Sequence, residues 1–170
     1  MNDIVQQPNG IFPGRVKADF PPGTVVFLIG MRINRFRSVR KWLPQFLAMP
    51  KMLRELFRQP DSPLLGARTW MGWRVVMVQQ YWRSMDELMT YAQSAESEHL
   101  PAWKAFNLAM RGNTSTGVWH EAYVVQPEGA HNIYVNMPAF GMSEATSIVS
   151  TAHPRVRRSA DREATPTTQK

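Results

Sequence analysis

The stretch TVVFLIGMRIN, residues 24–34, is rich in β-branched and apolar residues and predicts the first strand of the central fold. It begins apolar on both faces and then alternates, with Met31 and Ile33 facing one way and Arg32 and Asn34 the other. We therefore expect a mostly buried strand whose far end has a polar face. Arg32 and Asn34 are candidates for polar groups that fix a ligand, although Asn34 is also suited to capping the turn into the next helix.

Helical and extended patterns alternate after this strand. Ser38 is suited to be the N-cap of an amphipathic helix that Pro44 and Pro50 kink or break. A hairpin then turns at Met71-Gly72, and a capping box that begins at Ser84 opens a second helical region. The later strands that we predict are Leu64–Trp70, Trp73–Trp82, Thr116–Val125 and His131–Asn136.

This order of elements, β-α-β-β-α-β with one late strand, is that of the ferredoxin-like unit. The predicted fold class is therefore α+β, an antiparallel sheet with helices on one face. We assign Trp82, Val118 and Tyr123 to the other face, which makes that face apolar as well. A sheet that is apolar on both faces needs a second cover, and we predict a homodimer in which two sheets meet face to face.

The central domain is predicted to span residues 24–142. Residues 1–23 contain four prolines and three glycines, and we expect them to form an irregular N-terminal arm. Residues 143–170 are expected to form a disordered basic C-terminal tail, because polar side chains predominate from His153 onwards without an apolar period.

The chain of 170 residues contains no cysteine, which excludes disulfides, thiolate metal sites and a cysteine nucleophile. Its longest apolar stretch, about Val25–Met31, is far shorter than a membrane-spanning helix needs. The first ten residues include an acid and lack the basic region of a signal peptide. We therefore expect a soluble, cytoplasmic protein.

The net charge of +7 is unevenly distributed along the chain. Between Arg35 and Arg58, seven basic residues stand against one acidic residue. A basic helix face is ordinarily a solvated surface, and weak contact with an anionic membrane or an acidic partner is the sharper hypothesis. No nucleic acid partner is expected, because the sequence has no recognition motif.

Three stretches are similar to a known family: YWRSMDELMTYAQSAESEHLPAWKAFN at residues 81–107, TGVWHEAYVV at 116–125 and IYVNMPAFGM at 133–142. They resemble a family of small bacterial and fungal proteins of unknown function that is labelled monooxygenase-like. It is a branch of the antibiotic-biosynthesis-monooxygenase group of dimeric α/β barrels. The resemblance implies a cavity between sheet and helices that takes a flat or polycyclic apolar molecule. Some members of the group oxygenate polyketides without a cofactor, and others bind haem.

The haem-degrading members of that group imply three site residues here. Their asparagine at the end of the first strand corresponds to Asn34, and their iron-binding histidine corresponds to His99. Their second helix carries a tryptophan where this chain has Tyr91, a departure that argues against haem degradation. The resemblance therefore implies either no cofactor or a haem whose iron His99 binds. Without haem, His99 is either a general base or a surface or helix-end histidine that balances local carboxylates.

His120 and Glu121 are neighbours in a predicted strand, so their side chains point to opposite faces and do not form an acid–base pair within one chain. His120 is either a core histidine or a general base. Glu121 lies between Trp119 and Tyr123, where an apolar wall would favour the protonated carboxyl that a general acid needs. Pairing with an arginine of a neighbouring strand is the alternative for Glu121.

We predict a ligand pocket lined by an arginine and five aromatic residues: Arg32, Tyr91, Trp82, Trp103, Trp119 and Tyr123. Apart from haem at His99 no metal site is expected, and without a glycine-rich phosphate loop neither flavin nor nucleotide is expected. These features favour a monooxygenase-type oxidoreductase that binds an apolar or aromatic small molecule. The alternative is a non-catalytic carrier or sensor of haem or another hydrophobic ligand, peripheral to an anionic membrane.

Overall fold

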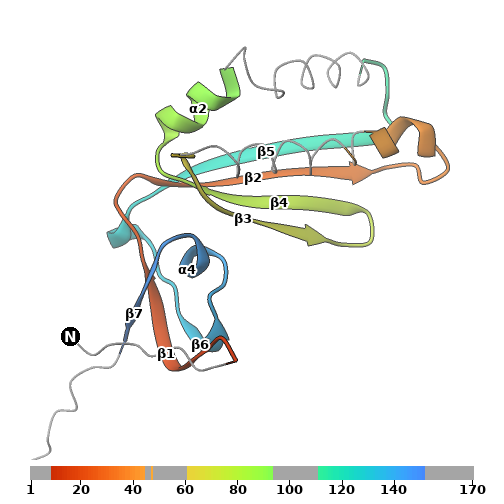
Figure 1. The fold of residues 1–170 in the computed structure, drawn as a ribbon. Helices are drawn as coiled ribbons and strands as arrows, with labels where there is room; N and C mark the ends of the chain where they lie inside the picture. Colours follow the sequence, from red (N-terminus) through yellow and green to blue (C-terminus); the bar gives the residue numbers. More distant parts are fainter. Residues whose placement is uncertain (1–8, 45–46, 48–60, 94–110, 152–170) are drawn as a thin grey trace, which may run out of the picture.

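The computed structural model describes residues 9–44, 47, 61–93 and 111–151. Its main sheet has four antiparallel strands in the order β3-β4-β2-β5 (Figure 1). The bounds of these strands are Thr24–Ile33 for β2, Leu64–Met71 for β3, Val75–Trp82 for β4 and Thr116–Val125 for β5. Because this is the strand order of the ferredoxin-like unit, the predicted α+β fold class is confirmed.

One face of the main sheet, here called the helix face, packs against α2, Met85–Gln93 (Figure 1). The capping box predicted at Ser84 is confirmed: its hydroxyl accepts the backbone N–H of Glu87 at 3.2 Å and lies 3.4 Å from the Glu87 carboxylate. Residues 39–44 are also helical, directly after Ser38. The buried residues between α2 and the sheet are Val25, Leu64, Trp82 and Leu88.

A second sheet brings together segments from both ends of the described chain, in the strand order β6-β1-β7. Its strands are Ile11–Asp19 for β1, Tyr134–Pro138 for β6 and Ser147–Ser150 for β7. The predicted irregular arm is therefore wrong over β1. The predicted disordered tail is wrong over β7 and over the short helix α4, Met142–Ala145.

The sequence pattern of β1 was obscured by its turn residues. Pro13 and Gly14 lie where the pairing with β6 shifts register, and Gly14 has a φ of +76°, which glycine adopts readily. After this bulge, exposed Lys17 alternates with buried Val16 and Ala18. That alternation is the period of a half-buried strand, and it extends over too few residues to outweigh the proline and glycine signals.

The opposite face of the main sheet, here called the α4 face, is covered at one end by the second sheet and α4 (Figure 1). The chain itself thus supplies part of the cover that we expected from a second subunit. Tyr123 lies on this face, but the prediction that Trp82 and Val118 do so is wrong, because they pair with Val25 and Met31 on the helix face. The buried residues under the second sheet are Ala18, Phe20, Tyr81 and Met142.

A short 3-10 helix, Pro127–Gly129, lies between β5 and β6. Within the described ranges, no helix is long and apolar enough to cross a membrane. Residues 1–8 and 152–170, which belong to the predicted arm and tail, lie outside the described residues.

Gly66 allows the close approach of α4 to β3. A Cβ atom at Gly66 would lie 2.9 Å from Cβ of Ala145 and 3.2 Å from its Cα, so the substitution Gly66→Ala forces backbone to move. We expect this variant to lose about 1–3 kcal/mol of unfolding free energy in urea titrations. The matched control is Gly129→Ala, whose added Cβ meets nothing within 4 Å. Equal stabilities of the two variants would contradict this packing.

Candidate functional site

On the helix face, strands β2, β4 and β5 carry one titratable side chain, that of His120. Its ring centroid lies 5.9 Å from that of Phe27 on the neighbouring strand, and the two ring planes are tilted by 48°. Ile29 is its register partner in β2, and the His120 side chain is exposed. An imidazole held beside an aromatic ring on an apolar surface can act as a base toward a flat molecule that lies on that surface.

Trp82 and Tyr91 lie nearer to α2 on the same face. Trp82 is only 1% exposed, and its ring centroid lies 5.4 Å from that of Tyr91. The indole N–H of Trp82 donates to the side-chain carbonyl of buried Gln80 at 2.8 Å, so its polar group is satisfied within the core. Trp82 therefore forms the floor between the sheet and α2, and half-buried Tyr91 lies over it.

The polar end of β2 is occupied by contacts within the protein. The Asn34 amide donates to the backbone carbonyl of Thr114 at 3.1 Å, and its carbonyl oxygen accepts from the Arg32 guanidinium. Arg74 donates to the Asn34 backbone carbonyl at 3.2 Å. The Asn34 side chain thus ties the end of β2 to the segment that leads into β5, and Arg32 is exposed beside it.

Glu121 lies on the α4 face, opposite to His120, as the alternation of the strand predicted. Its carboxylate is exposed rather than enclosed in an apolar wall, and it accepts the Tyr123 hydroxyl at 2.8 Å. This hydrogen bond raises the pKa of Tyr123. The indole of Trp119 lies over Gly30, where a Cβ atom would be 2.9 Å from its Nε1 atom.

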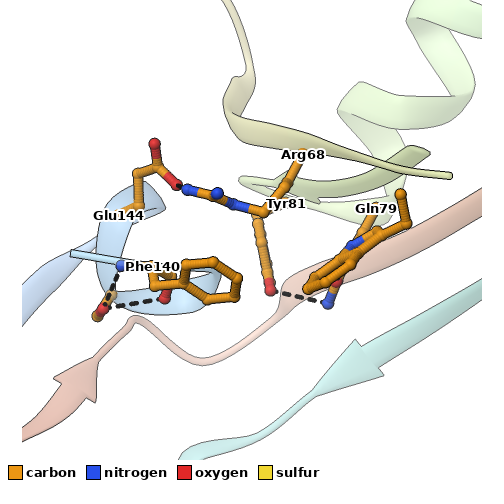
Figure 2. Close-up of polar contacts among 7 residues, drawn as sticks. Arg68, Gln79, Tyr81, Phe140 and Glu144 are labelled. Atoms are coloured by element: carbon orange, nitrogen blue, oxygen red, sulfur yellow. Dashed lines mark hydrogen bonds and ion pairs between the residues drawn. The ribbon is translucent and has the colours of Figure 1, made fainter. Parts of the chain in front are cut away.

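A cluster that sequence analysis did not select joins α4 to the main sheet (Figure 2). The Arg68 guanidinium forms an ion pair with Glu144 and lies 4.0 Å above the centroid of the Phe140 ring. The Trp70 ring packs edge-on against Phe140, with the centroids 5.7 Å apart. Ser143 receives the Phe140 backbone N–H at 3.0 Å and thereby fixes the turn into α4.

Tyr81 lies at the end of a hydrogen-bond chain in the same cluster (Figure 2). The Trp70 indole donates to the Gln79 carbonyl at 3.1 Å, and the Gln79 amide donates to the Tyr81 hydroxyl at 2.8 Å. Burial, with a smaller contribution from Tyr134, raises the pKa of Tyr81 to about 12. Tyr81 is therefore a protonated phenol at neutral pH and serves as a hydrogen-bonding group rather than as a base.

Part of this cluster had a signal in the sequence. Arg68 and Trp70, like Gln79 and Tyr81, are two residues apart in one strand and so share a face. Glu144, however, comes from the segment that we expected to be disordered. The two-residue alternation of the hairpin strands predicts that the residues of β3 and β4 in this cluster share a face. The contribution of α4 depends on the contact of Arg68 with Glu144, which is 76 residues away in sequence.

The remaining predicted site residues do not assemble a metal centre in the part of the chain that the structure describes. His99 and Trp103 lie outside the described residues. Among the described residues, no three metal-ligating side chains come together. Asn34, which the resemblance places beside haem, is bonded to Arg32 and Thr114 instead. Of the three residues that the resemblance places beside haem, the described part of the chain therefore contains Asn34 and Tyr91 and leaves out His99.

Comparison with known proteins was made by family and by structure. The family model described as Monooxygenase af470-like matches residues 24–142. The chain belongs to this family. The match begins with β2 and ends at the start of α4, so the monooxygenase family model covers the whole main sheet and leaves β1 and β7 outside. No curated protein matches the chain significantly.

Several solved structures are similar to this member of the Monooxygenase af470-like family. An aldoxime dehydratase, OxdRE, in complex with butyraldoxime is 17% identical with a TM-score of 0.61, covering 76% of this chain and 39% of that chain. A second aldoxime dehydratase is 20% identical with a TM-score of 0.60, covering 76% and 40%. This chain thus spans about two fifths of the length of those proteins, and the likeness is one of fold.

A third similar structure is SnoaB from Streptomyces nogalater, a cofactor-independent oxygenase. It is 11% identical with a TM-score of 0.42, and the match covers 61% of this chain and 94% of that chain. An antibiotic biosynthesis monooxygenase structure from Deinococcus radiodurans is 16% identical with a TM-score of 0.42, covering 63% and 96%.

Tyr81 provides a direct test of the buried cluster. Its folded-state pKa of about 12 lies above the ordinary value of 10.0, so folding favours the neutral phenol. This contribution to stability is complete below pH 10 and is lost as the pH rises from 10 towards 12. In a titration that follows tyrosinate absorbance, we expect the wild-type protein to show a step near pH 12 that the Tyr81→Phe variant lacks.

The control for this titration is the same pair of proteins in denaturant. In denaturant, the step that Tyr81→Phe lacks should fall near pH 10, because the pKa of an unperturbed tyrosine is about 10. A missing step near 10 in the folded proteins would show that Tyr81 is exposed to solvent and would contradict the cluster.

Proposed function

We propose that this member of the monooxygenase family oxidises a flat apolar molecule that lies between the helix face of the main sheet and the helices. The observation that carries the proposal is His120 beside Phe27, on a part of the helix face where its other neighbours, Ile29, Val118 and Ala122, are apolar. Membership of the Monooxygenase af470-like family supports an oxygenation, and the matched segment contains the whole of that face.

The chemistry follows from an imidazole base and molecular oxygen. The His120 imidazole removes a proton from a carbon or hydroxyl that is activated by adjacent aromatic rings, which gives a carbanion or enolate. Phe27 stacks against the rings and orients them toward the imidazole. The carbanion combines with O₂, and for a methylene substrate the loss of water leaves a carbonyl. One oxygen atom then enters the product, and the other leaves as water with the two substrate hydrogens.

Trp82 and Tyr91 support this site from the direction of α2. Their packed rings exclude water from the end of the face where the sheet meets the helix. A desolvated floor favours binding of an apolar ligand, and it also protects a carbanion from protonation by water. Trp82 is a positioning residue here, because its side chain is enclosed in the core.

We also propose that two copies of the chain pair over the part of the α4 face that the second sheet leaves open. Tyr123 on the edge strand β5 of this face is 52% exposed. An exposed aromatic face beside an unpaired edge strand is a surface that soluble proteins ordinarily cover. Pairing over this face leaves the helix face free for the substrate.

His120 is the residue whose substitution tests the proposed reaction. With anthrone, a tricyclic ketone with a methylene between aromatic rings, the wild-type protein should accelerate oxygen uptake over the spontaneous rate. We expect His120→Gln to reduce this acceleration about 100-fold or more, because it removes the general base. Binding of anthrone, followed by fluorescence quenching, should change little, since Phe27 and the apolar face remain.

The matched control is His131→Gln, an exposed histidine that precedes β6 and lies away from the helix face. Full oxygen uptake in His120→Gln would contradict the proposed role of the imidazole. Anthrone binding by the wild type without oxygen uptake would instead support a carrier that uses the same face.

A further inference from the structure

A basic and apolar surface lies at the end of the main sheet that is remote from the second sheet (Figure 1). It combines the segment that follows β2 with the turn between β3 and β4. The Phe36 and Trp73 rings meet edge to face there, with centroids 5.7 Å apart, and the Arg74 guanidinium lies 4.9 Å from the Phe36 centroid. Trp73 is 86% exposed, and neighbouring Met71 is exposed too. We call these residues, together with residues 35–44 and Leu47, the end surface.

The helical part of the end surface presents apolar side chains to solvent. Val39, Leu43 and Leu47 are spaced four residues apart, so they lie along one helix face, and all three are exposed. Arg40 and Lys41 are exposed beside them. An apolar stripe on a basic helix, with no other described element covering it, is the pattern of a helix that lies in a membrane interface.

The charges of the end surface have one sign. Arg35, Arg37, Arg40 and Lys41 are all exposed, and the sequence has no acidic residue between Asp19 and Glu55. The ion pairs within the described part of the chain join Arg68 to Glu144 and Arg83 to Glu87, and none of them includes an arginine of the end surface. Because these four side chains are exposed, an external anion can contact them.

From this arrangement we propose that the end surface docks on an anionic phospholipid bilayer. The cations would contact the lipid headgroups, while Trp73 and the stripe of Val39, Leu43 and Leu47 enter the interface between headgroups and acyl chains. A nucleic acid fits this surface less well, because the exposed aliphatic stripe has no role against phosphates. The proposal is independent of the oxygenation proposed above, since it involves neither His120 nor Phe27.

Vesicle co-sedimentation of the full chain tests the proposal. Binding is compared between vesicles of phosphatidylcholine with phosphatidylserine and vesicles of phosphatidylcholine alone, at low and physiological ionic strength. We expect binding to the anionic vesicles only, with weakening as salt rises. The double variant Arg37→Gln/Arg40→Gln should bind about 30-fold more weakly. Trp73→Ala and Leu43→Ser should each weaken binding about tenfold through lost apolar contact.

Matched controls separate docking at this surface from general attraction of a basic protein. The double variant Arg15→Gln/Lys17→Gln removes the same charge from exposed positions of β1, and Val135→Ser removes an exposed apolar side chain from β6. Both controls should bind like the wild type. Three results would overturn the proposal: no binding to anionic vesicles at low salt, equal losses in test and control variants, or binding of a duplex oligonucleotide as tight as that of the vesicles.

Discussion

The structure depends on one constraint: the main sheet has two faces with apolar side chains, and each must be covered. β2 lies inside the sheet with β4 on one side and β5 on the other, so neither of its faces can be left to solvent over its whole length. On the helix face, α2 covers the end that contains Val25 and Trp82. On the α4 face, the two ends of the described chain form a second sheet that covers Tyr81. The contacts of Arg68 with Glu144 and Phe140, and the absence of a side chain at Gly66, hold α4 against the sheet.

The features that sequence analysis predicted correctly are those with local causes. The stretch Thr24–Asn34 contains β2 because β-branched and apolar residues run together there, and the capping box at Ser84 fixes the start of α2 through atoms three residues apart. The hairpin closes at Gly72, whose N–H donates to the Val75 carbonyl at 2.8 Å. β1 was missed because its strand period is short and interrupted by a bulge, and its partners lie more than 100 residues away in sequence.

In the candidate site, too, the features with local causes were predicted and those that depend on distant parts of the chain were not. That His120 and Glu121 face opposite ways follows from the two-residue period of a strand, and the register confirms it. The surroundings of each side chain do not follow from that period. Asn34 was placed correctly at the end of β2, yet its amide is occupied by Thr114, 80 residues away. The hydrogen-bonded pair of buried Tyr81 and half-buried Gln79 lies beside α4, which sequence patterns did not predict. Exposure at the end surface likewise depends on which apolar residues are covered, and Trp73 is 86% exposed although its ring meets that of Phe36.

The second sheet covers one end of the α4 face, and we propose that a second copy of the chain covers the rest. Sedimentation velocity at micromolar concentration tests this most directly. The predicted result is a species of about twice the chain mass of 19.5 kDa, which dissociates when Tyr123→Arg places a charge in the open part of the face. A wild-type protein that sediments as a 19.5 kDa monomer would contradict the pairing.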